Sequence, residues 1–555
     1  TFMLSKNKIL TRAFSWIRQH AGIFMTLVFL VVHLLTINHY GFTWDFHFHF
    51  FGGGKLLGFE PQQLEPRNLP FVEPDPRRAW TLPYGALMSI PPVATYLLLH
   101  KSLAILPADS AYHLPIIVWG VMGIFVIFTF IKEAIHPRVA LISALLLGLT
   151  PRFFGDLHNN MKDIPSAVIF AINIWLLWRL VTHQRIIDMF WAVTAFAVAF
   201  NVKINSVFIP IVFASWLGFL WLFQRHKTTI NYKRILLYFI FSPIAAFLLW
   251  WVFWPNPIDQ LRHAFLTFGV GTNNIEVLLN GTWYCSGSTV PWYYPLWYLT
   301  ITTPLVILFS GIAGSCCVIA QKKYHRIGLL FVLWLCIPLL RYIVPSIGVI
   351  DGIRHFEEVL FPIAALASIG MNEIYLWFKK RVNRHIGLFV LISAVLYLLL
   401  AIYQHHPYQI SYFNELIGGI RGAMGKYDLD YWGTSQKAAV LWVNKHAPQN
   451  AKVHIVMSAA VAAQYLRPDL LPQLNRYGYD ESDFVIVLNR QSFFYRFFYA
   501  YEYLLHHTPV HTISTRGAPL TWIFDNRTNN QTSRQQPWWQ GEDPCIIPYW
   551  REQRP

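Results

Sequence analysis

The sequence predicts a polytopic α-helical membrane protein that carries a small α/β domain outside the membrane at its C-terminal end. Of the 555 residues, 55% are hydrophobic and only 13% are charged. Many apolar runs reach the roughly 20 residues that a helix needs to cross a bilayer. The basic residues, which give a net charge of +16, cluster in short segments between these runs. That pattern is typical of membrane orientation, because cytoplasmic loops are rich in Lys and Arg, and it argues against a nucleic-acid partner.

The apolar runs predict about eleven spans, near residues 23–37, 114–131, 138–150, 164–180, 188–202, 206–223, 235–253, 292–319, 327–344, 355–376 and 386–404. The stretch 82–106 is also apolar, but prolines, a histidine and a lysine interrupt it. If it spanned the membrane, most basic segments further along would lie outside, so we expect an interfacial helix there.

This topology divides the chain into two predicted domains. Residues 1–404 form a transmembrane catalytic domain with outer loops at 39–113, 151–163 and 254–291. Residues 405–555 form the extracytoplasmic α/β domain. Hydrophobic periodicity in that domain predicts helices at 435–446 and 493–506 and strands at 452–457, 484–488 and 520–524. Cys285 and Cys545 both lie on the outer side, so a disulfide between them is possible.

A polar stretch at 151–165 stands out between two apolar runs. It contains five ionisable side chains, which are Arg152, Asp156, His158, Lys162 and Asp163. Other outer loops place further ionisable groups at the membrane boundary, namely Asp45, His47, His49, Lys203, Asp351, Arg354 and His355. Charges at such a depth are costly unless they are paired or functional.

Carboxylates and cations beside a bilayer suit a lipid substrate that carries a phosphate. The cations would neutralise the phosphate, and a carboxylate would activate an incoming nucleophile. We therefore predict that Asp45 and Asp163 face each other in one site. Two carboxylates with His and Asn nearby could also hold a hard divalent cation.

Each of these residues also has a structural explanation. Asp45 and Asp163 could cap the helices that follow them, Lys203 could snorkel to the interface, and Arg354 could anchor a span. The histidines of 47–49, on a segment predicted to be extended, suit packing better than metal binding.

The ensemble of motifs resembles the GT-C superfamily of polyprenyl-phosphate-sugar-dependent glycosyltransferases. That superfamily includes protein O-mannosyltransferases and the lipid A aminoarabinose transferase. The resemblance rests on an Asp in the first outer loop, an Asp-x-Pro that begins a later span, a Lys in a short outer turn, and several short motifs. In this chain they are Asp45, residues 163–165, Lys203, 291–296, 354–356, 407–414 and 430–433.

The resemblance implies a GT-C-like fold and an inverting transfer of a sugar from a polyprenyl-phosphate donor to an acceptor hydroxyl. The acceptor would be a lipid, a glycan or a protein. The reaction would take place on the outer face of the membrane, in a bacterial inner membrane the periplasmic face. Asp45 would be the general base, and Asp163 would orient the acceptor or help to bind a metal. The donor phosphate would be bound by Lys203 and Arg354, assisted by Arg152 or Lys162.

Two questions stay open at the level of sequence. Many superfamily members have Asp-Glu in the first loop, whereas this chain has Asp45 followed by Phe46. Whether Asp45, His49 and Asp163 form a Mg or Mn site therefore stays open. A transporter or flippase of a lipid-linked saccharide would have similar spans and cations. It should, however, carry charges near mid-membrane and often matching halves, and we find neither.

Overall fold

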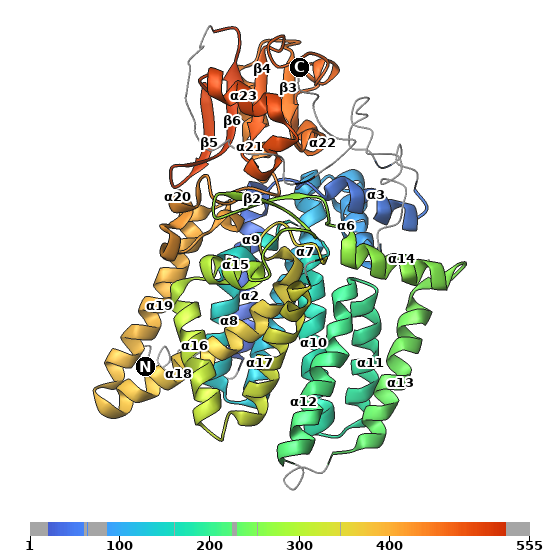
Figure 1. Ribbon diagram of the computed structural model, residues 1–555, viewed down its shortest axis with the longest axis vertical. Coiled ribbons are helices and arrows are strands. Elements are labelled where there is room, and N and C mark those ends of the chain that lie inside the picture. The colour runs from blue at the N-terminus through green and yellow to red at the C-terminus, as the bar shows by residue number, and fades with distance from the viewer. Residues whose placement is uncertain are drawn as a thin grey trace, which may run out of the picture.

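The computed structural model describes residues 20–59, 64, 86–159, 161–224, 230–251, 254–344, 346–528 and 545. A bundle of long helices makes up most of the molecule, and a small sheet domain sits at one end of it (Figure 1). The basic N-terminal segment before residue 20 lies outside the described residues.

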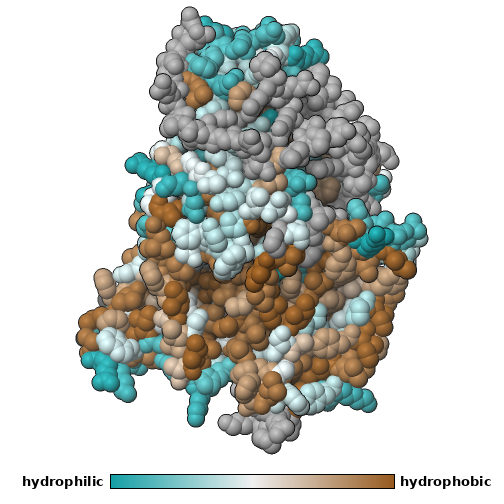
Figure 2. Space-filling view, viewed as in Figure 1, coloured by the Kyte–Doolittle hydropathy of each residue, from teal (hydrophilic) through white to brown (hydrophobic). Residues whose placement is uncertain are grey.

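Within the described residues, eight helices are long and apolar enough to cross a membrane. They are α2 (Ala21–Thr36), α7 (Ala108–Ala134), α10 (Asp163–Thr182), α12 (Phe208–Gln224), α13 (Tyr232–Leu249), α17 (His325–Leu340), α18 (Leu360–Arg381) and α19 (Arg384–His405). The bundle surface carries large apolar side chains that no part of the protein covers, among them Leu35, 75% exposed, and Ile319, 80% exposed. On the face seen in Figure 2, brown apolar residues cover most of the helical bundle. The chain is therefore an integral membrane protein.

Three further predicted spans are present as shorter or bent helices. The span at 292–319 is a pair, α15 (Tyr294–Thr302) and α16 (Leu305–Ala320), that bends by 119°. The other two are α8 (Pro137–Gly148) and α11 (Ile186–Phe200), of 12 and 15 residues. Helix α8 stops early because Pro151, which has no backbone N–H, begins the separate short helix α9 (Pro151–Asp156).

The two ends of the bundle differ in chemistry, as the topology predicts. The turn between α16 and α17 lies at the end away from the sheet domain (Figure 1). The turn between α18 and α19 carries Lys379, Lys380, Arg381 and Arg384. By the positive-inside rule this end is the cytoplasmic one, which remains a prediction.

The first outer loop is more helical than predicted. From residue 86 onward the stretch 82–106 forms η2 (Ala86–Ser89), α6 (Ile90–Thr95) and a π-helical turn, η3 (Tyr96–Ser102), none long enough to span. The 47–49 histidines lie on α3 (Phe46–Leu56), so the prediction of an extended segment is wrong. The alternation of Phe and His there has the two-residue period of a strand. The run of glycines that follows lets the helix pack closely on its neighbours.

The C-terminal domain follows α19. Its sheet has the order β3-β4-β6-β5, with β3 parallel to β4 and the other pairs antiparallel. The strands are β3 (Val453–Val456), β4 (Phe484–Leu488), β5 (His511–Thr515) and β6 (Ala518–Asp525), and the main helices are α21 (Gln436–His446) and α23 (Phe498–His506). Sequence periodicity predicted all of these except the half-exposed edge strand β5. The fold class is thus confirmed.

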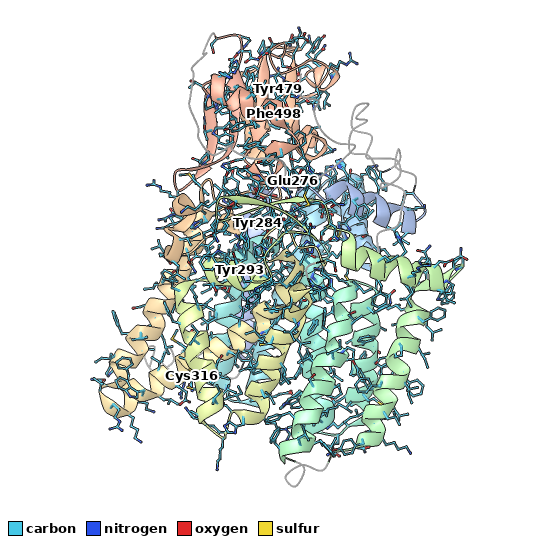
Figure 3. All side chains as sticks on the ribbon, viewed as in Figure 1. Glu276, Tyr284, Tyr293, Cys316, Tyr479 and Phe498 are labelled. Carbon is cyan, nitrogen blue, oxygen red and sulfur yellow. A yellow bond between two sulfur atoms is a disulfide. The ribbon has the colours of Figure 1, made fainter. Side chains whose placement is uncertain are left out.

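Several buried contacts fix this domain to the helical bundle. Lys437 Nζ lies 2.7 Å from Asp109 Oδ2, and the Tyr465 hydroxyl donates to the same oxygen at 2.9 Å. Arg496 Nε lies 2.6 Å from Glu276 Oε2. Figure 3 labels Glu276 at the junction between the two parts.

The possible disulfide between Cys285 and Cys545 is present, with the two Cα atoms 5.2 Å apart. It joins the tail of the chain to the outer hairpin of β1 (Glu276–Leu279) and β2 (Thr282–Cys285).

Candidate active site

Four of the predicted site residues stand at the ends of different elements. Asp45 precedes α3, and Asp163 is the first residue of α10. Lys203 lies in the turn between α11 and η4 (Ile204–Val207), and Arg354 begins η7 (Arg354–Val359), which leads into α18. Because each residue follows or precedes a helix, the packing of the bundle sets where its side chain points.

The structure joins these four residues in one continuous network. Lys203 Nζ lies 2.8 Å from Asp163 Oδ1 and donates to the backbone carbonyl of Arg354 at 3.3 Å. Arg354 Nη2 lies 3.2 Å from Asp45 Oδ2. Asp45 and Arg354, which are 309 positions apart in the sequence, thus belong to one cluster with Asp163 and Lys203.

Helix capping does not account for either aspartate. Asp163 is already inside its helix, Asp45 is at the N-cap position, and neither residue's helix has a side-chain cap hydrogen bond. A capping carboxylate would accept from the backbone N–H groups of the first turn. Lys203 is 9% exposed, so it does not snorkel into solvent either.

Lys162 lies close to the network, and Arg152 lies near Asp156 in the same stretch. Arg152 is buried on α9, where its Nε donates to the Tyr412 carbonyl at 3.3 Å and its Nη1 has no hydrogen-bond partner among the described residues. Burial lowers the pKa of Lys162 to about 8; the charge of Lys203 adds to this, and Asp163 opposes it. Lys162 therefore lies close enough to interact electrostatically with both Lys203 and Asp163.

Asp156, in the same stretch, hydrogen-bonds the carboxyl group of Glu357. Both side chains are buried, and the Asn159 amide donates to Asp156 Oδ1 at 3.1 Å. Burial raises the pKa of Asp156 to about 6, against the effect of its hydrogen bonds. Two carboxyl groups in contact hold at least one proton between them. His158 lies outside the charged network, packed flat on the Tyr40 ring at 3.7 Å.

Sequence analysis missed the contribution of the C-terminal domain to the site. The guanidinium of Arg354 lies 4.4 Å from the centre of the Trp432 ring, and its Nη1 lies 3.0 Å from Asp351 Oδ2. The other oxygen of Asp351 lies 2.7 Å from Arg490 Nη2. The motif around Trp432 contributed to the family resemblance without a role, and no pattern in the sequence marked Arg490.

The proposed metal ligands Asp45, His49 and Asp163 are not grouped as a metal-binding cluster among the described residues. Asp45 and Asp163 are each paired with a cation. Among the residues that the structure describes, no group of three or more His, Cys, Asp and Glu is placed to hold a metal ion. A divalent cation here would have to displace two ion pairs and lie among four cationic side chains. The donor set fits an anion better.

Comparison with solved structures gives low identities over long stretches. The chain is similar to ArnT from Cupriavidus metallidurans bound to undecaprenyl phosphate, with a TM-score of 0.49, 10% identity and coverage of 92% of this chain and 98% of that one. It is similar to the Archaeoglobus fulgidus oligosaccharyltransferase with a TM-score of 0.45, 13% identity and coverage of 84% and 61%. It is also similar to the arabinofuranosyltransferase AftD from Mycobacteria, with a TM-score of 0.41, 12% identity and coverage of 91% of this chain and 42% of that one.

No curated protein matches the sequence. Residues 89–251 match the sequence profile of a family described as dolichyl-phosphate-mannose-protein mannosyltransferase. The matched segment includes Arg152, Lys162, Asp163 and Lys203, but it ends before Arg354 and begins after Asp45. Over residues 89–251 the chain is therefore similar to this mannosyltransferase family, one of the families that the predicted resemblance named.

Proposed function

We propose that the protein is an inverting glycosyltransferase that moves a sugar from a polyprenyl-phosphate donor to an acceptor hydroxyl at the outer membrane face. One observation carries the proposal, the network of Asp163, Lys203, Arg354 and Asp45. A site with paired carboxylates and an excess of cations suits a reaction whose leaving group is a phosphate. The profile match at residues 89–251 supports the same class of enzyme.

Asp45 is the better general base of the two aspartates. Its side chain is 35% exposed and its ion pair with Arg354 is 3.2 Å long, whereas the Asp163 side chain is 7% exposed and held by Lys203 at 2.8 Å. An acceptor can therefore reach Asp45. Asp163 is fixed, so its part is to orient Lys203 and, through its second oxygen, the acceptor.

The reaction is a single displacement. The acceptor oxygen attacks the anomeric carbon while Asp45 takes the hydroxyl proton. The bond between that carbon and the phosphate oxygen breaks, its electron pair leaves with the phosphate, and the anomeric configuration inverts. Lys203 and Arg354, with Arg152 and Lys162 beside them, stabilise the negative charge of the leaving phosphate.

The test is transfer by the purified full-length protein from a panel of polyprenyl-phosphate sugars to lipid, glycan and peptide acceptors. Asp45→Asn is expected to lower kcat at least about 100-fold, because general-base catalysis contributes about 10²–10⁴-fold. A suitable control is Asp188→Asn, since Asp188 is also buried and paired with an arginine, Arg179, at 2.9 Å. It lies at the α10–α11 turn, so transfer per folded protein should not change.

Full transfer by Asp45→Asn would refute the assignment of the base. Movement of lipid-linked saccharide across vesicles without any transfer would favour a flippase instead. We also propose that no metal ion takes part, since both carboxylates are already paired. The same assay with a chelator tests this, and a loss of activity that Mg or Mn restores would contradict it.

A further inference from the structure

Arg490 is the residue through which the C-terminal domain reaches the charged network. It lies between β4 and η12 (Gln491–Tyr495) and is 5% exposed. Its Nη1 donates to the Tyr431 carbonyl at 2.9 Å, and its guanidinium lies 3.7 Å from the centre of the Phe493 ring. These contacts, both within the C-terminal domain, hold the guanidinium in one orientation.

The Nη2 atom of Arg490 points out of its own domain to Asp351. Asp351 is buried between two guanidinium groups, with one oxygen 2.7 Å from Arg490 and the other 3.0 Å from Arg354. Its backbone has a φ of +57°, in the left-handed region that residues with a side chain seldom adopt. The turn therefore holds the Asp351 carboxylate where both arginines can reach it.

A second set of contacts runs from Arg490 to the residue beside the proposed base. The Arg490 guanidinium lies 5.0 Å from the centre of the Trp44 ring. The backbone N–H of Trp44 donates to the Trp432 carbonyl at 2.9 Å, and the Trp432 ring packs on the guanidinium of Arg354. The C-terminal domain thus contacts the chain on both sides of the Asp45–Arg354 pair.

We propose that Arg490 is a positioning residue that keeps Arg354 and Asp45 in the geometry required for transfer. This proposal rests on the proposed function. Asp351 and Asp45 compete for the guanidinium of Arg354. While Arg490 occupies one oxygen of Asp351, Arg354 shares only the other and keeps its Nη2 for Asp45. Without Arg490, both oxygens of Asp351 can take Arg354 in a bidentate pair, and Arg354 then withdraws from Asp45. The site is therefore complete only when the C-terminal domain is docked.

The experiment compares Arg490→Ala with Arg496→Ala in the full-length protein. Arg496 is a matched control because it also joins the C-terminal domain to an outer loop, through its 2.6 Å pair with Glu276. Its guanidinium packs on Phe493 and, among the described residues, forms no ion pair with Asp351 or Asp45. Arg490→Ala is expected to lower kcat about 10- to 100-fold, the effect of a small misplacement of reacting groups, and to change the donor KM less than about threefold. Arg496→Ala also removes a docking contact, so it should lower kcat, but by less than Arg490→Ala, because the contacts of Asp351 with Arg490 and Arg354 remain.

Two further variants separate positioning from a general structural effect. Arg490→Lys keeps one ion pair with Asp351, so it should recover part of the lost kcat. In an Asp351→Asn background, Arg490→Ala should cost much less than it does alone, because both residues act through Arg354. Additive losses, or an effect on the donor KM alone, would overturn the proposal.

A readout without catalysis covers the case in which no donor is accepted. Hydrogen exchange of residues 43–49 and 351–356 should be faster in Arg490→Ala than in wild type or Arg496→Ala. No transfer by wild-type protein combined with this faster exchange would refute the proposed function and support the positioning role. Equal exchange in the two alanine variants would refute the positioning role whether or not the enzyme is active.

Discussion

At the scale of single residues, the site depends on cations at the membrane boundary whose charge is stabilised by paired carboxylates. Lys162 is one whose charge changes within an accessible pH range, because burial and the neighbouring Lys203 lower its pKa to about 8. It is positively charged below that pH and neutral above it. Asp156, whose pKa burial raises to about 6, also changes charge near neutral pH.

Binding of a polyprenyl phosphate should therefore weaken as the pH rises from 7 to 9. We expect a loss of about tenfold, since a hydrogen bond to a charged group contributes about 1.5–3 kcal/mol, and Lys162→Gln should bind weakly with a flatter profile. The measurement is a titration of the protein with polyprenyl phosphate at several pH values. An equally steep decline in Lys162→Gln would show that another group is responsible.

The sequence predicted the four central residues because each lies at the outer end of an apolar run, where an unpaired charge is costly. It did not predict that Asp351 pairs with both Arg354 and Arg490. The contact between Asp351 and Arg490 joins residues 139 positions apart in different domains, and the turn that places Asp351 has no hydropathy signal. Charge and depth are local properties of a sequence, whereas the choice of partner depends on how the domains dock.

At the scale of elements, hydropathy predicted where the helices lie but not how closely they pack. Helix α3 shows the difference. Its pattern of Phe and His imitates a strand, yet the glycines after it allow the helix to approach η2. A Cβ atom added to Gly53 would lie 2.2 Å from the Ser89 carbonyl oxygen. Since the Ser89 oxygen belongs to the backbone and the backbone of α3 fixes the position of the Cβ atom, no side-chain rotation can relieve that contact.

Gly53→Ala should therefore destabilise the protein, although Ala favours a helix over Gly by about 1 kcal/mol. We expect a net cost of about 1–3 kcal/mol, typical of overpacking, together with reduced transfer because α3 begins directly after Asp45. Gly218→Ala on α12 is the control, since nothing lies within 4 Å of its added Cβ. Thermal unfolding in detergent compares the two, and a Gly53→Ala variant as stable as Gly218→Ala would contradict the close packing.

At the scale of the whole molecule, the proposed active site lies where two domains meet. The helical bundle supplies Asp163, Lys203 and Arg354, and the C-terminal domain covers them with Trp432 and Arg490. The docking contacts therefore have a functional consequence: whatever loosens the C-terminal domain also loosens the geometry around Arg354. Stability of the interface and catalysis should change together.

Lys437→Ala tests this coupling most directly. It removes the cation from Asp109, which is 3% exposed, and also the hydrogen bonds from Lys437 to the carbonyls of Asn38 and Tyr40 at 2.8 and 2.9 Å. Loss of one partner from a buried ion pair costs about 3–5 kcal/mol. The C-terminal domain should undock more often, so that protease cuts it faster and transfer falls, even though Lys437 is not in the Arg354 network.

Lys323→Ala is the control, because its pair with Glu373 has a similar length of 2.9 Å but a lysine that is 54% exposed, and exposed pairs contribute about 0–1 kcal/mol. If Lys437→Ala undocks the domain while transfer stays at the wild-type rate, the C-terminal domain does not complete the site.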